Sequence, residues 1–398
     1  MVQRLRLRNF RSFKDATIEL RPMNIVVGAN ASGKTNLVQA FRFLRDLARS
    51  GLENAVALQG GAEYLTHLQS REREVTIELV MAPKMLVRSE GTDREGLQVE
   101  TIRYELTIQT IRTKNSARIV RETLEVWHAA SKSKATVLEM TREGKVVRVR
   151  PTDSPLLRVR FRKGERFELE TGTSLFGIAP LILGLPPFLF GENITIYDFS
   201  PKQAKQAIPV ASTHTLSEDG SNLPLVVQQL VRDPRQRERL LRLVQSVLPY
   251  IQHLHTTMVG GQHVQLQVQE TYHGKRALPA ILLSDGTVEV VALVIALFFS
   301  RLPDGLVILE EPNRNLHPGL MGALMELLRA AAERDQVLIT THNPELVRHA
   351  ELDELVLVER DAEGNSIVKR PADQEGVKIF LEENLELDYL HTQQLLGV

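Results

Sequence analysis

Hydrophobic and polar positions alternate at the start of the chain and then change to a helical spacing. Residues 3–10 alternate between apolar and polar side chains, and the short runs Ile18–Leu20 and Asn24–Val27 also have strand character. In Asn36–Arg49 the apolar side chains recur three or four positions apart, which predicts a helix. A glycine-rich run separates the last strand from this helix, so the predicted order is strand, loop, helix.

The next part of the chain, from about residue 75 to residue 169, has strand character without a long helical period. The candidate strands are residues 75–80, 102–108, 135–140, 146–150 and 157–162. We therefore predict an antiparallel sheet that is inserted between the two halves of an α/β core.

The last part of the chain begins with a helical segment and continues as strands and helices in alternation. Residues 223–248 have helical spacing, with a break at Asp233-Pro234. The segments that follow are predicted as strands at 264–268 and 280–283, a helix at 288–299, a strand at 306–310, a helix at 319–334, and strands at 337–341 and 355–358. This alternation predicts a parallel sheet.

Taken together, the patterns predict an α/β protein with a parallel-sheet core, an inserted antiparallel β lobe and a helical subdomain. The chain of 398 residues is long enough for two or three folding units. The predicted ranges are residues 1–60 for the first part of the core, 61–200 for the β lobe, 201–260 for the helical subdomain and 261–398 for the second part of the core.

Charge and cysteine content narrow the possible functions. Lys+Arg and Asp+Glu both number 49, so a contact with nucleic acid needs a local patch of positive charge. Residues 142–166 offer such a patch, with Arg158, Arg160 and Arg162 on one face of a predicted strand, although most runs of this kind are solvated faces. Cysteine is absent, which excludes disulfides and thiol catalysis and fits a reducing compartment.

Two apolar stretches do not predict membrane spans. Val290–Phe299 is shorter than the roughly 20 residues that a spanning helix needs. Thr171–Gly191 is uncharged, but three prolines interrupt it, so we predict buried irregular chain or a contact surface. The N-terminus has no apolar core of a signal peptide. We therefore expect a cytoplasmic protein that does not enter the membrane.

The glycine-rich run Gly28–Thr35 fits the phosphate-binding pattern G-x-x-x-x-G-K-[ST]. Its glycines let consecutive backbone N–H groups turn toward phosphate oxygens, and the following helix adds its positive N-terminal end. Lys34 is expected to reach the β- and γ-phosphates, and Thr35 to place its hydroxyl on Mg²⁺. Because a strand precedes the run and a helix follows it, the run predicts binding of ATP and magnesium.

Two apolar strands in the second half end in residues that suit chemistry on a phosphate. The predicted strand 306–310 ends at Glu310, and Glu311 follows it directly. Hydrolysis of a phosphate needs one carboxylate near the metal and a second that orients or deprotonates the attacking water. Residues 337–341 lead into His342, which is expected to bond the γ-phosphate or that water. Taken singly, an acidic turn or a histidine after a strand is often structural.

A fourth motif, Ser284-Asp-Gly-Thr287, stands just before the predicted helix 288–299. A small hydroxyl residue and a glycine at a helix N-terminus can bind phosphate oxygens. On chemistry alone, an ordinary helix N-cap is the better interpretation.

In this order, the four motifs resemble the ABC-type ATPase heads of the RecF, SMC and OLD proteins. Residues 7–13 and 24–36 are similar to their N-terminal signature, and residues 219–223 are similar to a recurring stretch. The resemblance is greatest to the stand-alone ATPases near RecF, which carry Ser-Asp-Gly-Thr, Glu-Glu-Pro, Leu-His-Pro and Thr-His-Ser-Pro. Those motifs match residues 284–287, 310–312, 316–318 and, with Asn for Ser, 341–344.

The resemblance implies that two heads sandwich two ATP molecules, with residues 284–286 of one head closing over the ATP of the other. It implies that Glu311 is the catalytic carboxylate, His342 the switch histidine and Lys34 a further catalytic residue. Thr35 and Glu310 would hold the magnesium ion. The residues expected to bind the nucleotide are Gly28, Asn30, Ser32, Gly33, Lys34, Thr35, Asn36, Ser284, Asp285 and Gly286.

Three positions depart from the pattern of that group. Glu310 stands where most P-loop ATPases have Asp, Val288-Glu289 replaces Leu-Arg, and Asn313-Arg314 replaces Glu-Asn. The charge reversal at residue 289 is expected to weaken or alter the docking of a partner. The glutamine that couples the metal to the β lobe is not assigned, and the candidates are Gln59, Gln69 and Gln203.

The leading hypothesis is an ATPase that dimerises on ATP and acts on DNA or a DNA-linked complex, as in repair or anti-phage defence. The alternative is a nucleotide-dependent switch that controls a separate effector protein such as a nuclease or toxin. A transporter ATP-binding subunit is a weaker third hypothesis, because the stretch between Thr35 and Ser284 is too long for one. A metal site at His253, His255 and His263 lacks a carboxylate that would complete it.

Overall fold

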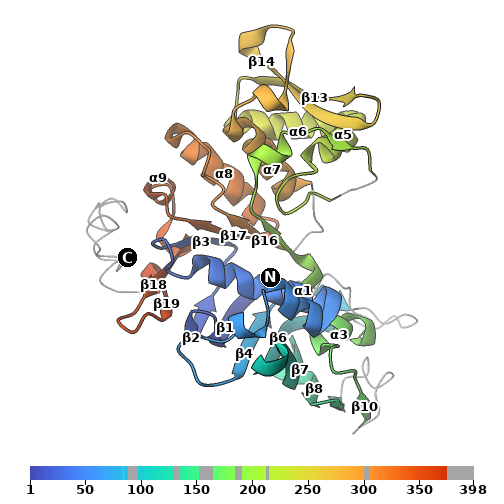
Figure 1. The fold of residues 1–398 in the computed structure, drawn as a ribbon, viewed down its shortest axis with the longest axis vertical. Coiled ribbons are helices and arrows are strands. Elements are labelled where there is room, and N and C mark those ends of the chain that lie inside the picture. The colour runs from blue at the N-terminus through green and yellow to red at the C-terminus, as the bar shows by residue number, and fades with distance from the viewer. Residues whose placement is uncertain are drawn as a thin grey trace.

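The structure is a computed structural model, and its described residues form two large sheets and a smaller one, with helices around them (Figure 1). The predicted strand at 157–162, with its three arginines, lies outside the described residues. Within the described residues, no helix combines the length and the apolar composition that crossing a membrane requires. The described ranges are 1–83, 85–87, 97–129, 134–151, 165–183, 191–211, 215–299 and 305–373.

The α/β core is built on a sheet with the strand order β11-β16-β17-β3-β18-β19. Neighbouring strands run parallel except for β18 and β19, which form an antiparallel hairpin. The central strands are almost entirely apolar, so both of their faces are buried, as parallel sheets require. The bounds are β11 (Ile194–Tyr197), β16 (Leu306–Glu310), β17 (Gln336–Thr341), β3 (Met23–Val27), β18 (Leu355–Arg360) and β19 (Ser366–Lys369).

The β lobe is an antiparallel sheet with the order β10-β9-β8-β7-β6-β4-β1-β2, and β5 pairs with β6. Two strands from the predicted first core range, β1 and β2, belong to this sheet, whereas β11 from the predicted lobe range joins the core sheet. The bounds are β1 (Val2–Phe10), β2 (Phe13–Glu19), β4 (Glu74–Met81), β5 (Met85–Val87), β6 (Leu97–Ile111), β7 (Ser116–Ala129), β8 (Lys134–Glu143), β9 (Val146–Pro151) and β10 (Arg166–Glu168).

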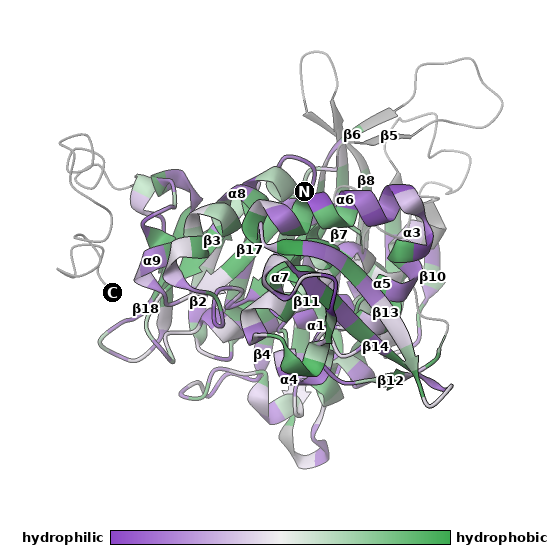
Figure 2. Ribbon diagram, turned by 90° about the horizontal axis from the view of Figure 1, so that it is seen from above, coloured by the Kyte–Doolittle hydropathy of each residue, from purple (hydrophilic) through white to green (hydrophobic). Residues whose placement is uncertain are grey.

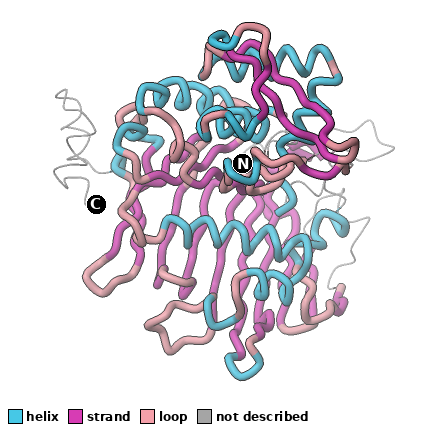
Figure 3. The backbone as a smooth tube through the Cα atoms, turned by 45° about the horizontal axis from the view of Figure 1, so that its top comes forward, coloured by secondary structure: helices cyan, strands magenta, loops and turns pink. Residues whose placement is uncertain are grey.

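Helix α1 (Lys34–Leu58) packs between the two large sheets, where Figure 3 shows it crossing the strands of the lobe. Its apolar residues, among them Leu37 and Phe41, share one core cluster with strands of both sheets. The apolar side chains that recur at helical spacing in residues 36–49 therefore form the face of α1 that packs against this core. Because α1 is packed between the two sheets, its first turn is fixed in position. The phosphate-binding loop, which directly precedes that turn, is positioned with it.

The opposite face of the core sheet is covered by helices and by a small sheet. Helix α7 packs there with its apolar side chains buried, whereas Figure 2 colours much of the outer helix α6 hydrophilic. The elements are α4 (Pro201–Ala204), β12 (Ile208–Pro209), α5 (Leu223–Arg232), α6 (Pro234–Val247), β13 (Ile251–Val259), β14 (His263–Glu270), β15 (Ala277–Pro279), α7 (Asp285–Phe298), α8 (Met321–Ala332) and α9 (Pro344–Val347).

Two expectations about local structure were wrong. Residues 280–283 are not a strand, because Ala280–Leu282 form a 3₁₀ turn after the short strand β15. Part of the stretch 171–191 is helical, since α3 (Leu175–Leu183) forms despite Pro180 inside it. Burial offsets the proline there, because Phe176 stacks on Tyr104 of the lobe with ring centroids 4.7 Å apart.

Candidate functional site

The phosphate-binding loop leaves the end of β3 and enters α1 in the conformation that its motif predicts. Ala31 and Gly33 have φ angles of 64° and 124°, and a left-handed backbone at Gly33 favours glycine. A Cβ atom at Gly28 would overlap the carbonyl oxygen of Val358, and one at Gly33 would overlap the hydroxyl of Ser366. Close packing therefore requires both glycines of the motif, and the backbone conformation also requires Gly33.

Lys34 is buried at the start of α1, and its ammonium group lies across the loop. Its Nζ donates hydrogen bonds to the carbonyl oxygens of Gly28 (2.6 Å) and Ala29 (3.1 Å). Burial lowers the pKa of Lys34, and the nearby Glu311 carboxylate opposes that shift. Thr35, the next residue, is exposed toward the open space in front of the loop.

A network of side chains supports the loop from behind. Ser366 of β19 donates a hydrogen bond to the carbonyl oxygen of Ser32 (2.5 Å) and contacts the hydroxyl of Ser12 (2.8 Å). Asn36 donates to the same Ser12 hydroxyl at 2.8 Å. Residues from both ends of the described chain thus hold the loop in place.

Glu310 is the last residue of strand β16, and charged side chains lie close to its carboxylate. Its carboxylate lies 3.5 Å from Arg42 of α1. Burial is the main cause that raises the pKa of Glu310 to about 7, and repulsion from Asp198 adds to it. Asp198 follows the parallel neighbour β11, whose Tyr197 pairs with Leu309 in register, so the two carboxylates end adjacent strands.

Glu311 is placed by an uncommon backbone conformation and by the next strand. Its φ angle is 46°, and its N–H donates to the carbonyl oxygen of Thr340 at 3.0 Å. Its Oε1 lies 2.7 Å from Nδ1 of His342, which must donate the proton because a carboxylate only accepts. The other oxygen, Oε2, is buried without a hydrogen-bond partner within the described residues.

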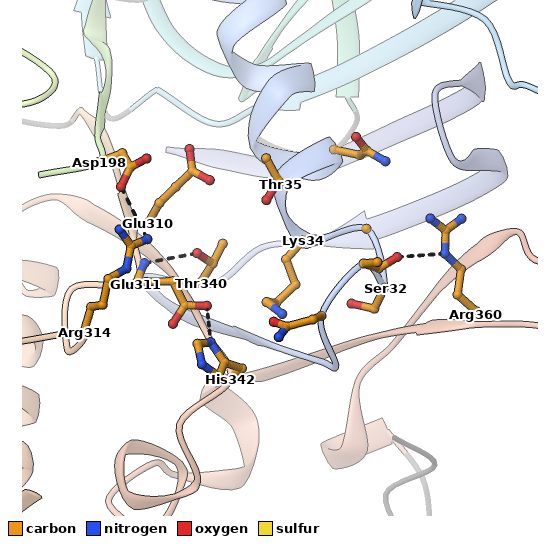
Figure 4. A pocket seen from close by; sticks show the side chains of 14 residues that line it. Ser32, Lys34, Thr35, Asp198, Glu310, Glu311, Arg314, Thr340, His342 and Arg360 are labelled. Atoms are coloured by element: carbon orange, nitrogen blue, oxygen red, sulfur yellow. Dashed lines mark hydrogen bonds and ion pairs between the residues drawn. The ribbon is translucent and has the colours of Figure 1, made fainter. Parts of the chain in front are cut away.

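These groups surround one cavity of about 540 Å³, shown in Figure 4. The phosphate-binding loop lines one side, and the ends of β16 and β17 line the other. The cavity therefore joins motifs that are separated by about three quarters of the sequence. Its lining residues are Asn30, Ala31, Ser32, Gly33, Lys34, Thr35, Asn36, Asp198, Glu310, Glu311, Arg314, Thr340, His342 and Arg360.

Sequence reasoning missed three charged residues of this cavity. Asp198 directly follows the four-residue strand β11, and Arg360 is the last residue of strand β18. Their positions at the ends of strands were the sequence signal that could have identified them. Arg314 was noted only as a departure from the family pattern, and it lies 3.6 Å from Asp198. None of the glutamine candidates lines this cavity within the described residues.

The motif at 284–287 lies outside the cavity, at the start of α7. The hydroxyl of Ser284 accepts a hydrogen bond from the N–H of Thr287 at 3.0 Å, which is the N-cap that chemistry alone predicts. Asp285 pairs with Lys205, and a Cβ atom at Gly286 would lie 2.6 Å from the carbonyl oxygen of Asn315. Within one chain, this motif and the phosphate-binding loop do not share a site.

Glu289 is inside the protein, so it cannot contact a partner as the sequence led us to expect. Only 3% of the residue is exposed, and its carboxylate accepts a hydrogen bond from Nδ2 of Asn315 at 2.7 Å. Burial raises the pKa of Glu289 to about 7. The residue thus links α7 to the segment that follows Glu311.

The cavity fits a magnesium nucleotide by its own chemistry. Ser32 Oγ and Glu311 Oε2 are buried in its wall and have no hydrogen-bond partner within the described residues. Buried polar atoms of this kind are suited to form hydrogen bonds with a bound ligand. Lys34 supplies the positive charge, and the Thr35 hydroxyl with the Glu310 carboxylate forms the oxygen donor set that magnesium prefers.

His253 and His255 lie on strand β13, where the sequence offered a histidine pair. The rings of His253 and His255 lie 5.7 Å apart on one face of the strand. Within the described residues, no group of three or more His, Cys, Asp or Glu side chains is placed to hold a metal ion.

Two protein-family models match the chain. Residues 1–145 match the family described as "AAA ATPase domain", and residues 160–348 match the family described as "AAA domain, putative AbiEii toxin, Type IV TA system". The first match includes most of the β lobe, and the two matches together carry all four motifs.

Curated relatives share shorter segments with the chain. The DNA replication and repair protein RecF of Moorella thermoacetica is 54% identical over 50 residues, which are 12% of this chain and 13% of that protein. The RecF protein of Acidothermus cellulolyticus is 33% identical over 102 residues, which are 23% of this chain and 28% of that protein. The similarity thus spans less than a third of either relative.

A solved structure shares the fold over almost the whole chain. It is an SMC head bound to the C-terminal winged-helix domain of ScpA, with a TM-score of 0.52 and 14% identity. The comparison covers 92% of this chain and 96% of that one. Together with the motifs, the two family matches and the RecF segments support a RecF- and SMC-like ABC-type P-loop ATPase, and the likeness to the SMC head shows the fold alone.

Proposed function

We propose that the chain binds ATP with Mg²⁺ in the cavity described above and hydrolyses it. The observation that carries this proposal is that Lys34, Glu310 and Glu311 face one another across a single space. Thr35 and His342 line the same space, so each group that phosphoryl transfer to water needs is present. Bound Mg²⁺, held by Thr35 and Glu310, supplies charge neutralisation at the phosphates.

The chain's own residues then have separate roles. Lys34 exchanges its two bonds to loop carbonyls for bonds to phosphate oxygens, which are stronger because both partners are charged. Glu311 keeps Oε1 on His342 and uses Oε2 to accept a proton from the attacking water. His342 therefore positions the base.

The second part of the proposal is that two copies close over two nucleotides. Ser284 and Gly286 lie outside the cavity of their own chain, so a second copy is needed to bring them to a nucleotide. Ile281 and Leu282, directly before this motif, are 53% and 65% exposed. Exposed apolar side chains beside the motif are suited to burial against a partner.

The third part concerns the biological role, for which we propose DNA-linked work such as repair or anti-phage defence in the cytoplasm. The support is the similarity to proteins named for DNA replication and repair. The test is the rate of ATP hydrolysis with and without single-stranded and double-stranded DNA. We expect stimulation by at least one form of DNA. A rate that neither form changes would contradict the DNA role but not the ATPase.

The control for this test is Lys34→Ala, which removes the charge that holds the phosphates. This variant is expected to lose ATP binding and hydrolysis in the presence and absence of DNA. Hydrolysis that persists in Lys34→Ala would come from a contaminating enzyme or from another site. Hydrolysis from another site of the chain would overturn the assignment of the cavity, and further purification distinguishes it from a contaminant.

A second candidate function is a nucleotide switch that controls a separate effector protein. One family match is described in terms of a toxin–antitoxin system, which favours this alternative. Native purification followed by mass spectrometry tests it: a stoichiometric partner whose retention depends on ATP supports the switch. Rapid ATP turnover by the isolated chain, stimulated by DNA alone, contradicts it.

A further inference from the structure

Arg314 is a charged residue of the nucleotide cavity that has no part in the hydrolysis as described so far. It is the third residue after Glu311 and lines the same cavity. Figure 4 shows its guanidinium pointing to Asp198, on the side of the cavity that carries Glu310 and Glu311. The stand-alone ATPases near RecF have asparagine at this position, so their pattern assigns no role to an arginine here.

The backbone on both sides of Arg314 is fixed by an asparagine. Asn313 is only 3% exposed, and its Oδ1 accepts a hydrogen bond of 2.9 Å from the last residue of β17. Asn315 donates through Nδ2 to the carboxylate of Glu289 on α7 at 2.7 Å. The N–H of Arg314 donates to the carbonyl oxygen of Glu311 at 3.1 Å, which closes a tight turn. The backbone of Arg314 is therefore held in a defined place beside the cavity.

The side chain of Arg314, in contrast, is weakly held. It is 52% exposed, and its Nη2 lies 3.6 Å from Oδ1 of Asp198, which is too far for a hydrogen bond. An exposed ion pair of this kind contributes at most about 1 kcal/mol. The guanidinium can therefore exchange Asp198 for a more highly charged partner at little cost in free energy.

Carboxylates gather on the side of the cavity that carries Arg314. Asp198, Glu310 and Glu311 line it, whereas Lys34 lies across the space on the phosphate-binding loop. Burial is the main cause that raises the pKa of Glu310, and the charge of Arg314 opposes that shift, so the guanidinium lies within electrostatic reach of this carboxylate. During phosphoryl transfer, negative charge spreads over the oxygens of the terminal phosphate. A cation beside Glu310 reaches those oxygens from the wall opposite Lys34.

We propose that Arg314 is a catalytic residue, which leaves Asp198 and binds an oxygen of the terminal phosphate of the ATP held by its own chain. Its guanidinium stabilises the negative charge that develops there. The water oxygen bonds to the terminal phosphorus, and the bond to the bridging oxygen breaks with its electron pair staying on ADP. Glu311 takes the proton of the water, and Arg314 exchanges none. This role rests on the proposed ATPase function.

The experiment measures the kinetics of Arg314→Ala and its binding of a transition-state analogue. The kcat is expected to fall about 10²–10³-fold, as for the loss of one donor to a developing oxyanion, while the KM for ATP changes little. Calorimetry with Mg²⁺ compares ADP alone with ADP plus aluminium fluoride, which imitates the phosphoryl group in transfer. Aluminium fluoride is expected to tighten the binding of ADP to the wild type. Arg314→Ala is expected to lose this gain and to bind ADP alone like the wild type.

Two further variants and a control accompany this measurement. Arg314→Gln removes the charge at a similar length and is expected to show the same two losses. Arg314→Lys keeps the charge but lacks the planar fork that binds two phosphate oxygens, so it is expected to recover part of both. The matched control is Arg242→Ala, which removes an exposed arginine of α6 that pairs with Glu238 at 2.6 Å. It is expected to match the wild type throughout.

The outcomes separate the role of Arg314 from the ATPase itself. A wild-type kcat in Arg314→Ala and Arg314→Gln, or an unchanged gain from aluminium fluoride, would overturn the role of Arg314 alone. Weaker binding of ADP alone, with the gain preserved, would show a structural role and would overturn it as well. If the wild type neither binds ADP nor hydrolyses ATP, the proposed ATPase function fails and the role of Arg314 fails with it.

Discussion

Glu311 and His342 are joined by a hydrogen bond of 2.7 Å between Oε1 and Nδ1, although 30 residues separate them in the chain. The bond exists because β16 and β17 are parallel neighbours, which brings the residues after both strands to the same edge of the sheet. Glu311 reaches it with a φ of 46°, a conformation that costs on the order of 1–3 kcal/mol for a residue other than glycine. The position of this carboxylate is thus maintained against backbone strain.

We predict that Glu311→Gln slows ATP hydrolysis about 10²–10⁴-fold, because an amide cannot accept the proton of the attacking water. ATP binding is expected to remain, so a dimer with two bound nucleotides should accumulate. Size-exclusion chromatography with light scattering, with and without ATP, measures this. Glu345→Gln, a change of a partly exposed residue nearby, is the control. A Glu311→Gln protein that stays monomeric with ATP under all conditions would contradict the sandwich.

Gly33→Ala is expected to abolish nucleotide binding. Alanine at a φ of 124° is strained, and its Cβ would also overlap the Ser366 hydroxyl, so the loop must shift away from its phosphate-binding conformation. The matched control is Gly172→Ala, because no atom lies within 4 Å of a Cβ there. Calorimetry with ATP and thermal unfolding should show normal behaviour for the control. Normal ATP affinity in Gly33→Ala would refute the required loop geometry.

Glu289→Gln is expected to stabilise the fold at high pH. Its pKa rises from 4.5 in the unfolded chain to about 7 in the folded one, so folding favours the protonated form. This contribution is fully present below pH 4.5 and is lost as the pH rises through 7, which amounts to about 3 kcal/mol. Chemical denaturation should therefore show a gain for the variant at pH 8 that is much smaller at pH 5.

Glu333→Gln, which changes an exposed residue, is the control for that measurement and should unfold like the wild type at both pH values. A Glu289→Gln variant that is destabilised equally at pH 5 and pH 8 would show that the residue acts through its hydrogen bond to Asn315 and not through its charge.

Asp198→Asn is expected to raise the Mg²⁺ concentration for half-maximal hydrolysis about tenfold. Asp198 lies at the end of the strand beside Glu310 and raises the pKa of that carboxyl, so its charge contributes to the field that attracts a cation. A magnesium titration of the rate measures this, together with ATP binding in the presence of a chelator, which should not weaken. The exposed Asp353→Asn is the control. An unchanged magnesium requirement would exclude Asp198 from the metal environment.

Local sequence was sufficient to predict the parts of the site that depend on neighbouring residues. The conformation of residues 28–35 follows from glycine spacing and from a strand before and a helix after it, so it was foreseen. The same holds for the break between α5 and α6 at Asp233-Pro234, where proline begins the second helix. Each of these features is determined within a few residues along the chain.

The tertiary structure decided everything that depends on which distant segments become neighbours. Strand order places Asp198 beside Glu310, and the β18–β19 hairpin places Arg360 and Ser366 against the phosphate-binding loop. Helix α3 forms across Pro180 because it gains a buried partner in the lobe, which local propensity does not include. The sequence by itself determined the chemistry of the phosphate site, since periodicity and loop geometry are local. Its complete charged lining arises only when chain segments hundreds of residues apart are packed together.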